Sequence, residues 1–239
     1  MKICIIGYGK MGHEVERVAL QRGHEIVATL DGEWEVIPPC DVAIEFTTPS
    51  TAFENISKGI QQGIPMVSGT TGWLDQWDDV LTKVDQHEGA FFYASNFSIG
   101  IYLFRKLNHF LGQMMNHYPQ YEASLEEVHH IHKLDYPSGT ALTLADDLIE
   151  QLAVKTTSRA YLSPAPQPSD ARSEELLIRS VREDEVPGTH TIRFESGEDL
   201  IEIKHEAKGR AGLALGAVMA AEFLQNKKGV YGMENLVNF

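Results

Sequence analysis

The fold is decided by residues 3–12, which read ICIIGYGKMG: a short apolar run, a G-x-G-x-x-G turn and the start of a helical pattern. In that context Gly7 permits a tight turn, Gly9 lets the backbone approach a pyrophosphate, and Gly12 lets the helix pack closely on the strand. Asp31 ends the next strand-like run, 19 residues after Gly12, where a carboxylate can hold a ribose hydroxyl. The pattern predicts a dinucleotide-binding lobe; a glycine turn that serves packing alone is the alternative.

Asp31 also bears on which dinucleotide binds. A carboxylate accepts hydrogen bonds from the free 2′-hydroxyl of NAD, whereas it repels the 2′-phosphate of NADP. The residue that follows is Gly32 rather than an arginine. We therefore expect NADH to be the preferred cofactor, with NADPH as the other choice.

Short apolar runs alternate with helical patterns through the first half of the chain. One predicted helix begins near Thr51, because Glu54 stands three residues on at capping-box spacing. Alternation of strands and helices predicts a parallel sheet covered on both faces. The strand-like runs lie at residues 3–6, 26–30, 42–46, 66–67 and 90–94.

Beyond Asn96 the pattern changes. A helix follows Pro137, and strand-like runs at 174–182, 189–195 and 200–207 are joined by turn residues, which predicts an antiparallel sheet. A long helix and a strand at 121–125 precede them. The apolar side chains that define the long helix are Leu103, Leu107, Phe110, Leu111 and Met114.

The expected architecture is α/β: a Rossmann-type doubly wound parallel sheet with a second, smaller α+β domain built on a mainly antiparallel sheet. Residues 1–97, completed by a C-terminal helix at 211–239, form the dinucleotide-binding domain. Residues 98–210 form the substrate-binding and oligomerisation domain.

Composition limits the partners. The chain has 20 Lys and Arg against 34 Asp and Glu, a net charge of −14, so nucleic acid and anionic membranes are disfavoured. Two cysteines make neither a disulfide framework nor a cysteine-based metal site, which fits a reducing compartment. Without a signal peptide or an apolar stretch of about 20 residues, we expect a cytoplasmic protein.

Residues 127–141, EVHHIHKLDYPSGTA, hold the densest chemistry in the chain. Strand alternation sends the first two histidines to opposite sides. An imidazole near its ordinary pKa of about 6.5 can donate a proton, and a neighbouring lysine can stabilise developing negative charge. The Ser-Gly-Thr segment precedes a helical run, so its N–H groups make a carboxylate receptor. A zinc site of the three histidines with Glu126 and Glu127, or a solvated charged loop, are the alternatives.

These residues match every specified position of E-x-H-H-x-x-K-x-D-x-P-S-G-T-A, the signature of the dihydrodipicolinate reductase family, which the chain resembles. The likeness continues through FTTP at 46–49, GTTG at 69–72, ASNFSIG at 94–100 and the segment 204–217. The chain departs from many members in its shorter glycine turn, and Thr48 stands where some relatives carry a basic side chain.

The resemblance implies roles for particular residues. His129 would be the general acid and Lys133 its partner, and no metal would be needed. The substrate carboxylates would be held by His130, Ser138, Gly139, Thr140 and Arg210. The cofactor would be bound by Gly7, Tyr8, Gly9, Lys10, Met11, Gly12, Asp31, Gly69, Thr70, Thr71, Ala94, Ser95, Asn96 and Phe97.

The implied reaction is the NAD(P)H-dependent reduction of 4-hydroxy-tetrahydrodipicolinate, a cyclic imine dicarboxylate, to tetrahydrodipicolinate in lysine and diaminopimelate biosynthesis. Hydride would add to the ring and His129 would return a proton. The resemblance also implies a homotetramer joined through the second sheet. A related NAD-dependent amino-acid or diamino-acid dehydrogenase is the alternative enzyme, and a non-catalytic nucleotide sensor is the alternative from another class.

Overall fold

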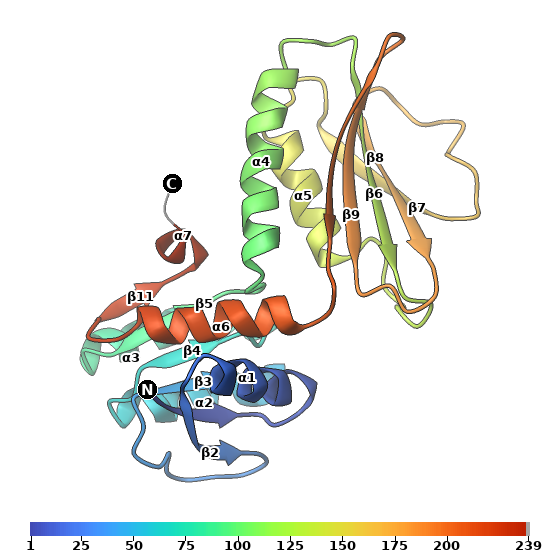
Figure 1. Ribbon diagram of the computed structural model, residues 1–239. Coiled ribbons are helices and arrows are strands. Elements are labelled where there is room, and N and C mark those ends of the chain that lie inside the picture. The colour runs from blue at the N-terminus through green and yellow to red at the C-terminus, as the bar shows by residue number, and fades with distance from the viewer. Residues whose placement is uncertain (238–239) are drawn as a thin grey trace. The chain divides into compact units, whose positions relative to one another are not determined.

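The computed structural model describes residues 1–237 and divides into two compact units. The first comprises Met1–Ile99 together with the segment from Arg210 onward, and the second comprises Gly100–Gly209. Each unit has its own sheet and its own helices (Figure 1). None of the helices within residues 1–237 combines the length and the apolar character that a membrane crossing requires.

The first unit is built on a six-stranded parallel sheet with the order β11-β5-β4-β3-β1-β2. All four residues of β3 are buried, as expected for a strand covered on both faces. The chain moves outward in opposite directions from β1 and β3, so a topological switch point lies between them. The strands are β1 (Lys2–Ile6), β2 (Glu25–Leu30), β3 (Val42–Glu45), β4 (Met66–Ser68), β5 (Ala90–Tyr93) and β11 (Gly229–Tyr231).

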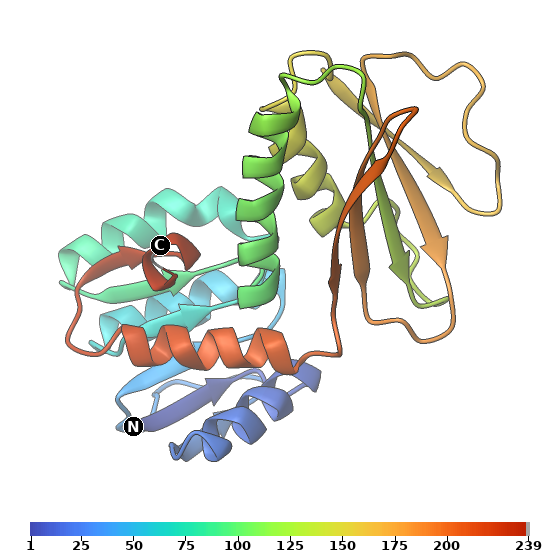
Figure 2. The same ribbon diagram turned by 45° about the horizontal axis from the view of Figure 1, so that its top comes forward.

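Helices cover both faces of this sheet, because right-handed connections running in opposite directions place them on opposite sides (Figures 1 and 2). Helix α6 packs on α1, where Glu222 accepts from Arg22 and contacts His24. A Cβ at Gly216 would lie 1.8 Å from the Phe97 carbonyl oxygen, so α6 needs glycine there. The helices are α1 (Lys10–Gln21), α2 (Pro49–Gln61), η1 (Leu74–Gln76), α3 (Trp77–Gln86), α6 (Ala211–Phe223) and α7 (Met233–Leu236).

The predicted start of α2 was wrong. The helix begins at Pro49, with Thr48 as N-cap and Thr51 at the third helical position of the capping box, so Glu54 takes no part in it. Proline suits the first helical position because its missing N–H would have no partner there. The glutamate pairs instead with Lys58 one turn on.

The second unit carries a five-stranded sheet with the order β10-β9-β6-β8-β7. Strands β9 and β10 run antiparallel in the way expected, but β8 is parallel to β6 and to β7. Strand β7 was not predicted; it and α5 carry the chain back across the sheet before β8, which makes the β6–β8 pair parallel. The strands are β6 (Glu122–His129), β7 (Thr157–Leu162), β8 (Glu175–Arg182), β9 (Thr189–Glu195) and β10 (Leu200–Glu206).

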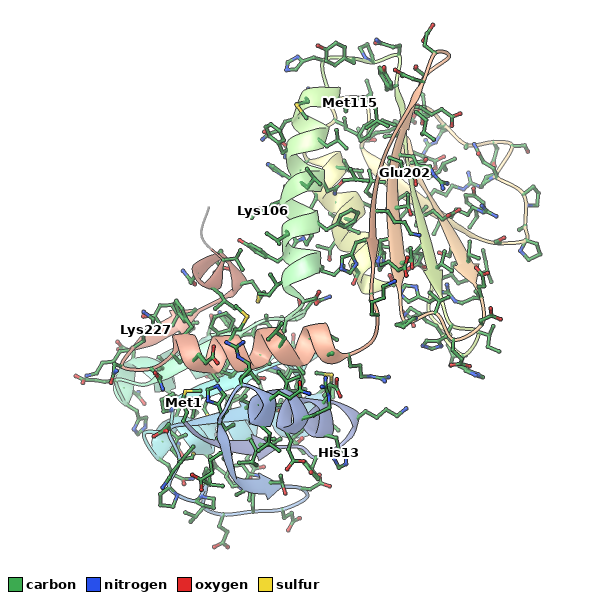
Figure 3. All side chains as sticks on the ribbon, viewed as in Figure 1. Met1, His13, Lys106, Met115, Glu202 and Lys227 are labelled. Atoms are coloured by element: carbon green, nitrogen blue, oxygen red, sulfur yellow. The ribbon has the colours of Figure 1, made fainter. Side chains whose placement is uncertain are left out.

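Helices α4 (Ile99–Met115) and α5 (Gly139–Ile149) lie on one face of this sheet and enclose the core of the unit with it (Figures 1 and 3). Met115 is buried in that core, whereas Lys106 on α4 points away from the sheet (Figure 3). The expected long helix is confirmed as α4, and Phe104, Leu111 and Met115 provide its contacts with the core. Four of the apolar residues that indicated this helix are exposed: Leu103, Leu107, Phe110 and Met114.

Candidate active site

The glycine turn of the first unit contains two glycines that are enclosed by backbone, Gly7 and Gly12, and one that faces open space, Gly9. Gly7 has φ +88°, and a Cβ there would lie 2.1 Å from the Phe46 carbonyl oxygen; a Cβ at Gly12 would lie 2.3 Å from that of Gly7. Neither position can carry a side chain without moving backbone. A Cβ at Gly9, in contrast, would meet nothing within 4 Å. Gly9 is therefore not needed for packing, and its bare backbone leaves space in front of the N-terminus of α1.

A cavity of about 360 Å³ opens beside this turn, at the carboxyl ends of β1, β3 and β4. That position next to the switch point is where open parallel sheets bind nucleotides. Six of the predicted cofactor residues line it. The lining residues are Gly9, Lys10, Met11, Phe46, Thr47, Pro49, Gly69, Thr70 and Thr71.

Glu45, a fully buried carboxylate, holds two loops of the cavity together. Its Oε1 accepts from the backbone N–H of Thr47 at 2.9 Å and from the hydroxyl of Thr70 at 2.8 Å, and its Oε2 accepts from the hydroxyl of Ser68 at 2.5 Å. The loop after β3 is thereby fixed to the loop after β4. Sequence analysis did not single out this residue, although a glutamate ending a buried strand is a signal that could have done so.

The remaining predicted cofactor residues do not line the cavity. Gly7 and Gly12 pack against backbone on the side of the turn away from the cavity. The Tyr8 ring packs against His13 with 4.0 Å between ring centroids. Asp31 follows β2 directly and is exposed, and the Leu30 carbonyl accepts from Gly7 N–H at 2.8 Å, which brings Asp31 close to the turn.

The segment from Ala94 to Phe97 follows β5. Ala94 and Phe97 are buried and Ser95 is exposed. The side chain of Asn96 accepts from the backbone N–H of Ser98 at 2.9 Å, which shapes the segment as a turn.

In the second unit, register alone assembles a polar row across the buried face of the sheet. Glu127 on β6 lies opposite His190 on β9 and Ser180 on β8, and His190 lies opposite His205 on β10. The rows before it are apolar, such as Leu125 with its neighbours. The inward-facing side chains of the sheet therefore change from apolar to polar toward the end of β6, which ends at His129.

Glu127 is fully buried and accepts from several donors. Its oxygens accept hydrogen bonds from the Ser180 hydroxyl at 2.7 Å and from the Ser138 backbone N–H at 3.1 and 3.2 Å. Although burial by itself raises the pKa of Glu127, the adjacent His129 ring and the donors Ser138 and Ser180 outweigh it and lower that pKa to about 2. The side chain is therefore a carboxylate at neutral pH.

His129 lies next to this carboxylate and is 8% exposed. Its Nδ1 is 3.3 Å from Glu127 Oε2, an ion-pair distance without the alignment of a good hydrogen bond. Such looseness is common in catalytic pairs before substrate closes on them. On the other side of the ring, a Cβ at Gly188 would lie 3.1 Å from Nε2, so the glycine keeps that nitrogen clear.

His190 packs edge-to-face on His129, with 5.3 Å between ring centroids. Burial, assisted by the charge of His129, lowers the pKa of His190 to about 4, so this ring is neutral at neutral pH. Its Nε2 is 3.3 Å from the Ser138 hydroxyl. The candidate acid His129 therefore packs against an uncharged ring.

Lys133 lies in the loop that follows β6, with its Nζ 2.8 and 2.9 Å from the two carboxylate oxygens of Asp135. Arg182 fixes this loop: its guanidinium donates to the carbonyls of Lys133 at 3.1 Å and Asp135 at 2.7 Å. Arg182, which lies opposite His129 in the register of β6 and β8, thus fixes the loop that carries the ammonium group, and it also lies 3.8 Å from Glu127 Oε1.

The predicted carboxylate receptor forms the first turn of α5. Ser138 is the N-cap, and its hydroxyl accepts from the Ala141 N–H at 3.2 Å, so this side chain is engaged inside the protein. The N–H groups of Gly139 and Thr140 belong to the first turn, which has no intrahelical acceptors for them. A Cβ at Gly139 would meet nothing within 4 Å, so the space before this helix is open.

The zinc alternative is not supported in the form expected. His132 is exposed and pairs with Glu185, and His130 lies beyond the end of β6. The group that does come together, with ligand-type atoms within 4.8 Å of one another, is Glu127, His129 and His190. Because protein donors already occupy both oxygens of Glu127, we interpret this group as a hydrogen-bond network.

Arg210, predicted to hold a substrate carboxylate, belongs to the first unit, whereas the receptor lies in the second. It is the N-cap residue of α6. The hydrogen bond with Arg17 is the main cause that lowers the pKa of Glu14 on α1, and the charge of Arg210 adds to it.

Sequence reasoning missed His190, Ser180, Arg182 and Gly188. Only the pairing of β6 with β8 and β9 brings them to His129, and no local pattern carries that information. Glu127 was weighed only as a metal ligand. Alternation along β6 puts it on the same face as Leu125, and a carboxylate on a core face is a signal that could have identified it.

Two family models match this chain. The model described as dihydrodipicolinate reductase, N-terminus, matches residues 1–97, and the one described as dihydrodipicolinate reductase, C-terminus, matches residues 100–237. A 4-hydroxy-tetrahydrodipicolinate reductase of Christiangramia forsetii is 43% identical over 242 residues, covering 100% of this chain and 98% of the relative. The enzyme of the same name from Staphylococcus aureus is 32% identical, covering 99% of this chain and 100% of its own.

Solved structures share the fold. A dipicolinate-bound dihydrodipicolinate reductase from a Paenisporosarcina species superposes with a TM-score of 0.76 at 23% identity, covering 99% of both chains. An amine dehydrogenase from Mycobacterium smegmatis, at 10% identity and a TM-score of 0.51, covers 96% of this chain and 94% of its own. At these identities both likenesses concern the arrangement of the elements alone.

Proposed function

The chain belongs to the dihydrodipicolinate reductase family, and we propose that it reduces 4-hydroxy-tetrahydrodipicolinate to tetrahydrodipicolinate with a reduced nicotinamide dinucleotide. The observation that carries the proposal is the grouping of His129, the Lys133 loop and the open first turn of α5 around one buried carboxylate. A proton donor beside an anion receptor suits a ring that bears carboxylates and must gain a proton.

In this proposal His129 is the catalytic acid. Its Nε2 faces the space that Gly188 leaves clear, while its Nδ1 is directed to Glu127. Protonated at both nitrogens, the ring gives up the Nε2 proton and stays bound to the carboxylate through Nδ1. Positioned acids of this kind contribute about 100-fold or more to rate.

The N–H groups of Gly139 and Thr140 bind one substrate carboxylate at the positive end of α5. Lys133 exchanges Asp135 for substrate and stabilises negative charge on the ring. Because these interactions hold parts of the substrate that do not react, they fix the geometry in which the reacting atoms meet.

The residues of the first unit fit a dinucleotide. The space at Gly9, the N-terminus of α1 and the adjoining cavity suit a pyrophosphate, and Lys10 supplies a cation at the same place. Gly69 to Thr71 and Ala94 to Phe97 complete the proposed contacts. When bound, the reduced nicotinamide supplies the hydride.

We further propose that NADH is preferred, because Asp31 follows β2 beside the glycine turn, Gly32 follows it, and Thr48 is the uncharged cap of α2. None of these three offers a cation to a 2′-phosphate. Equal or better kcat/KM with NADPH in parallel saturation curves contradicts this preference.

We also propose a homotetramer joined through the second sheet. Among the described helices, α4 and α5 lie on one face only, and the other face carries an ion-pair row in which Arg193 contacts Glu126 and Glu202. A sheet that has one face without helices and two edge strands can be completed by symmetric association. Light scattering behind a sizing column measures the assembly directly.

The deciding experiment is a reductase assay. Pyruvate and aspartate semialdehyde are condensed enzymatically to the substrate, and oxidation of NADH or NADPH is followed at 340 nm. Turnover that requires the condensed product supports the proposal. Cofactor oxidation with an amino acid or its keto acid, and none with the condensed product, assigns the chain to the alternative dehydrogenase class.

A further inference from the structure

We infer that Glu127 is a positioning residue that sets the tautomer of His129 and joins it to the carboxylate receptor. This inference rests on the proposed function for its catalytic consequence, but its structural content is independent of the substrate. One buried carboxylate contacts the ring that donates the proton and also the backbone that begins the anion-binding helix.

The tautomer of His129 follows from which neighbouring atoms can donate or accept a hydrogen bond. The carboxylate of Glu127 only accepts hydrogen bonds, so the Nδ1 facing it at 3.3 Å carries the proton. In neutral His129 the other nitrogen, Nε2, is then free of a proton, and in the imidazolium form it bears the proton that can be transferred. A buried carboxylate that fixes an imidazole in this way also stabilises the imidazolium.

The Ser138 N–H couples Glu127 to the carboxylate receptor. This group donates to both oxygens of Glu127 at 3.1 and 3.2 Å, so it is not available to a ligand. The contact anchors the N-cap of α5 and aims the N–H groups of Gly139 and Thr140 outward. Moving the carboxylate therefore displaces the acid and the receptor together.

Glu127 is the negatively charged group that faces His129, because the other titratable groups around the ring are neutral or cationic. His190 from β9 is neutral, while Arg182 from β8 and Lys133 from the following loop are cations. Arg182 also lies 3.8 Å from Glu127 Oε1. In Glu127→Gln the amide would face Nδ1 as a donor, which favours the neutral tautomer protonated on Nε2 and leaves the imidazolium without a partner.

The test compares wild type, Glu127→Gln and Glu126→Gln. The control removes a carboxylate one residue away that lies on the opposite face of β6 and pairs with Arg179. We expect Glu127→Gln to lower kcat by about 100-fold or more and to raise the substrate KM, with NADH affinity within about twofold of wild type. Glu126→Gln should match wild type in each respect.

The readout that a merely structural role would not move is the ¹⁵N spectrum of the His129 ring. Wild type should show the neutral ring protonated on Nδ1 and Glu127→Gln the ring protonated on Nε2. A wild-type ring protonated on Nε2 overturns the inference, even if the variant does not fold; so does an active variant with the wild-type tautomer. If wild type does not reduce the dicarboxylate, the proposed function fails, and the ring spectra still decide the role of Glu127.

Discussion

The buried ring of His190 should make the second unit sensitive to acid well above the range in which carboxylates titrate. Its pKa falls from 6.5 to about 4 because burial excludes the charged form and His129 adds its charge. Between pH 6.5 and about 4, His190 therefore binds a proton in the unfolded chain but not in the folded chain. Stability is complete above pH 6.5 and is lost as the pH falls toward 4.

The size of the effect follows from the two pKa values. A difference of about 2.5 units corresponds to at most about 3 kcal/mol, of which about 2.5 kcal/mol is lost by pH 4.5. Glu127, whose pKa is about 2, remains ionised in the folded chain throughout this interval. His190→Gln removes the titrating ring, so its free energy of opening should fall by about 2.5 kcal/mol less than that of wild type between pH 7 and 4.5.

Amide hydrogen exchange in β6 and β9 is the suitable assay. The three tryptophans, Trp34, Trp73 and Trp77, all belong to the first unit, so their fluorescence does not report on the second. His117→Gln, which changes an exposed histidine, is the matched control and should keep the wild-type slope. If His190→Gln loses as much stability as wild type over this range, the account of the buried ring is refuted.

Three further outcomes are expected. Gly9→Ala should weaken cofactor binding in a titration with little change in Tm. Gly12→Ala, whose Cβ would lie 2.3 Å from a backbone oxygen, should lower both the cofactor affinity and the Tm. Equal losses of Tm in the two variants contradict this division of roles. His129→Ala or Lys133→Ala should lower turnover by about 100-fold or more with unchanged cofactor affinity, and loss of cofactor binding would disprove the assignment. Arg210→Ala should mainly raise the substrate KM, and an unchanged KM removes this residue from the binding set.

The first unit was largely predictable because strands buried on both faces are continuous apolar runs, which are visible without an alignment. What escaped prediction depended on tertiary contact. Strand β11 has three residues and exists because it pairs with β5. At the start of α2 the local signal was present but misinterpreted, since a proline at the first helical position was a better guide than the spacing of Thr51 and Glu54.

The second unit was harder because its strands are mixed in direction and polarity. Strand β7 reads TSRAYL, with none of the strict alternation of a half-buried strand, and missing it made β8 look like the next strand of an antiparallel run. Of the site, His129 and Lys133 lie in one local motif and could be named from it. His190 and Ser180 required the register, because they lie 61 and 51 residues beyond His129 in the sequence.

The positions of the open glycines explain how a chain with a net charge of −14 can hold anions. Gly9 and Gly139 stand at the N-termini of α1 and α5, and a Cβ at either would meet nothing within 4 Å. Gly7 and Gly12, in contrast, are closed in by backbone. Packing therefore does not require glycine at the two open positions, and the proposed function assigns both to anion access at backbone N–H groups. Because these groups and the helix dipole act over one turn, each site can attract an anion while the surface as a whole repels one.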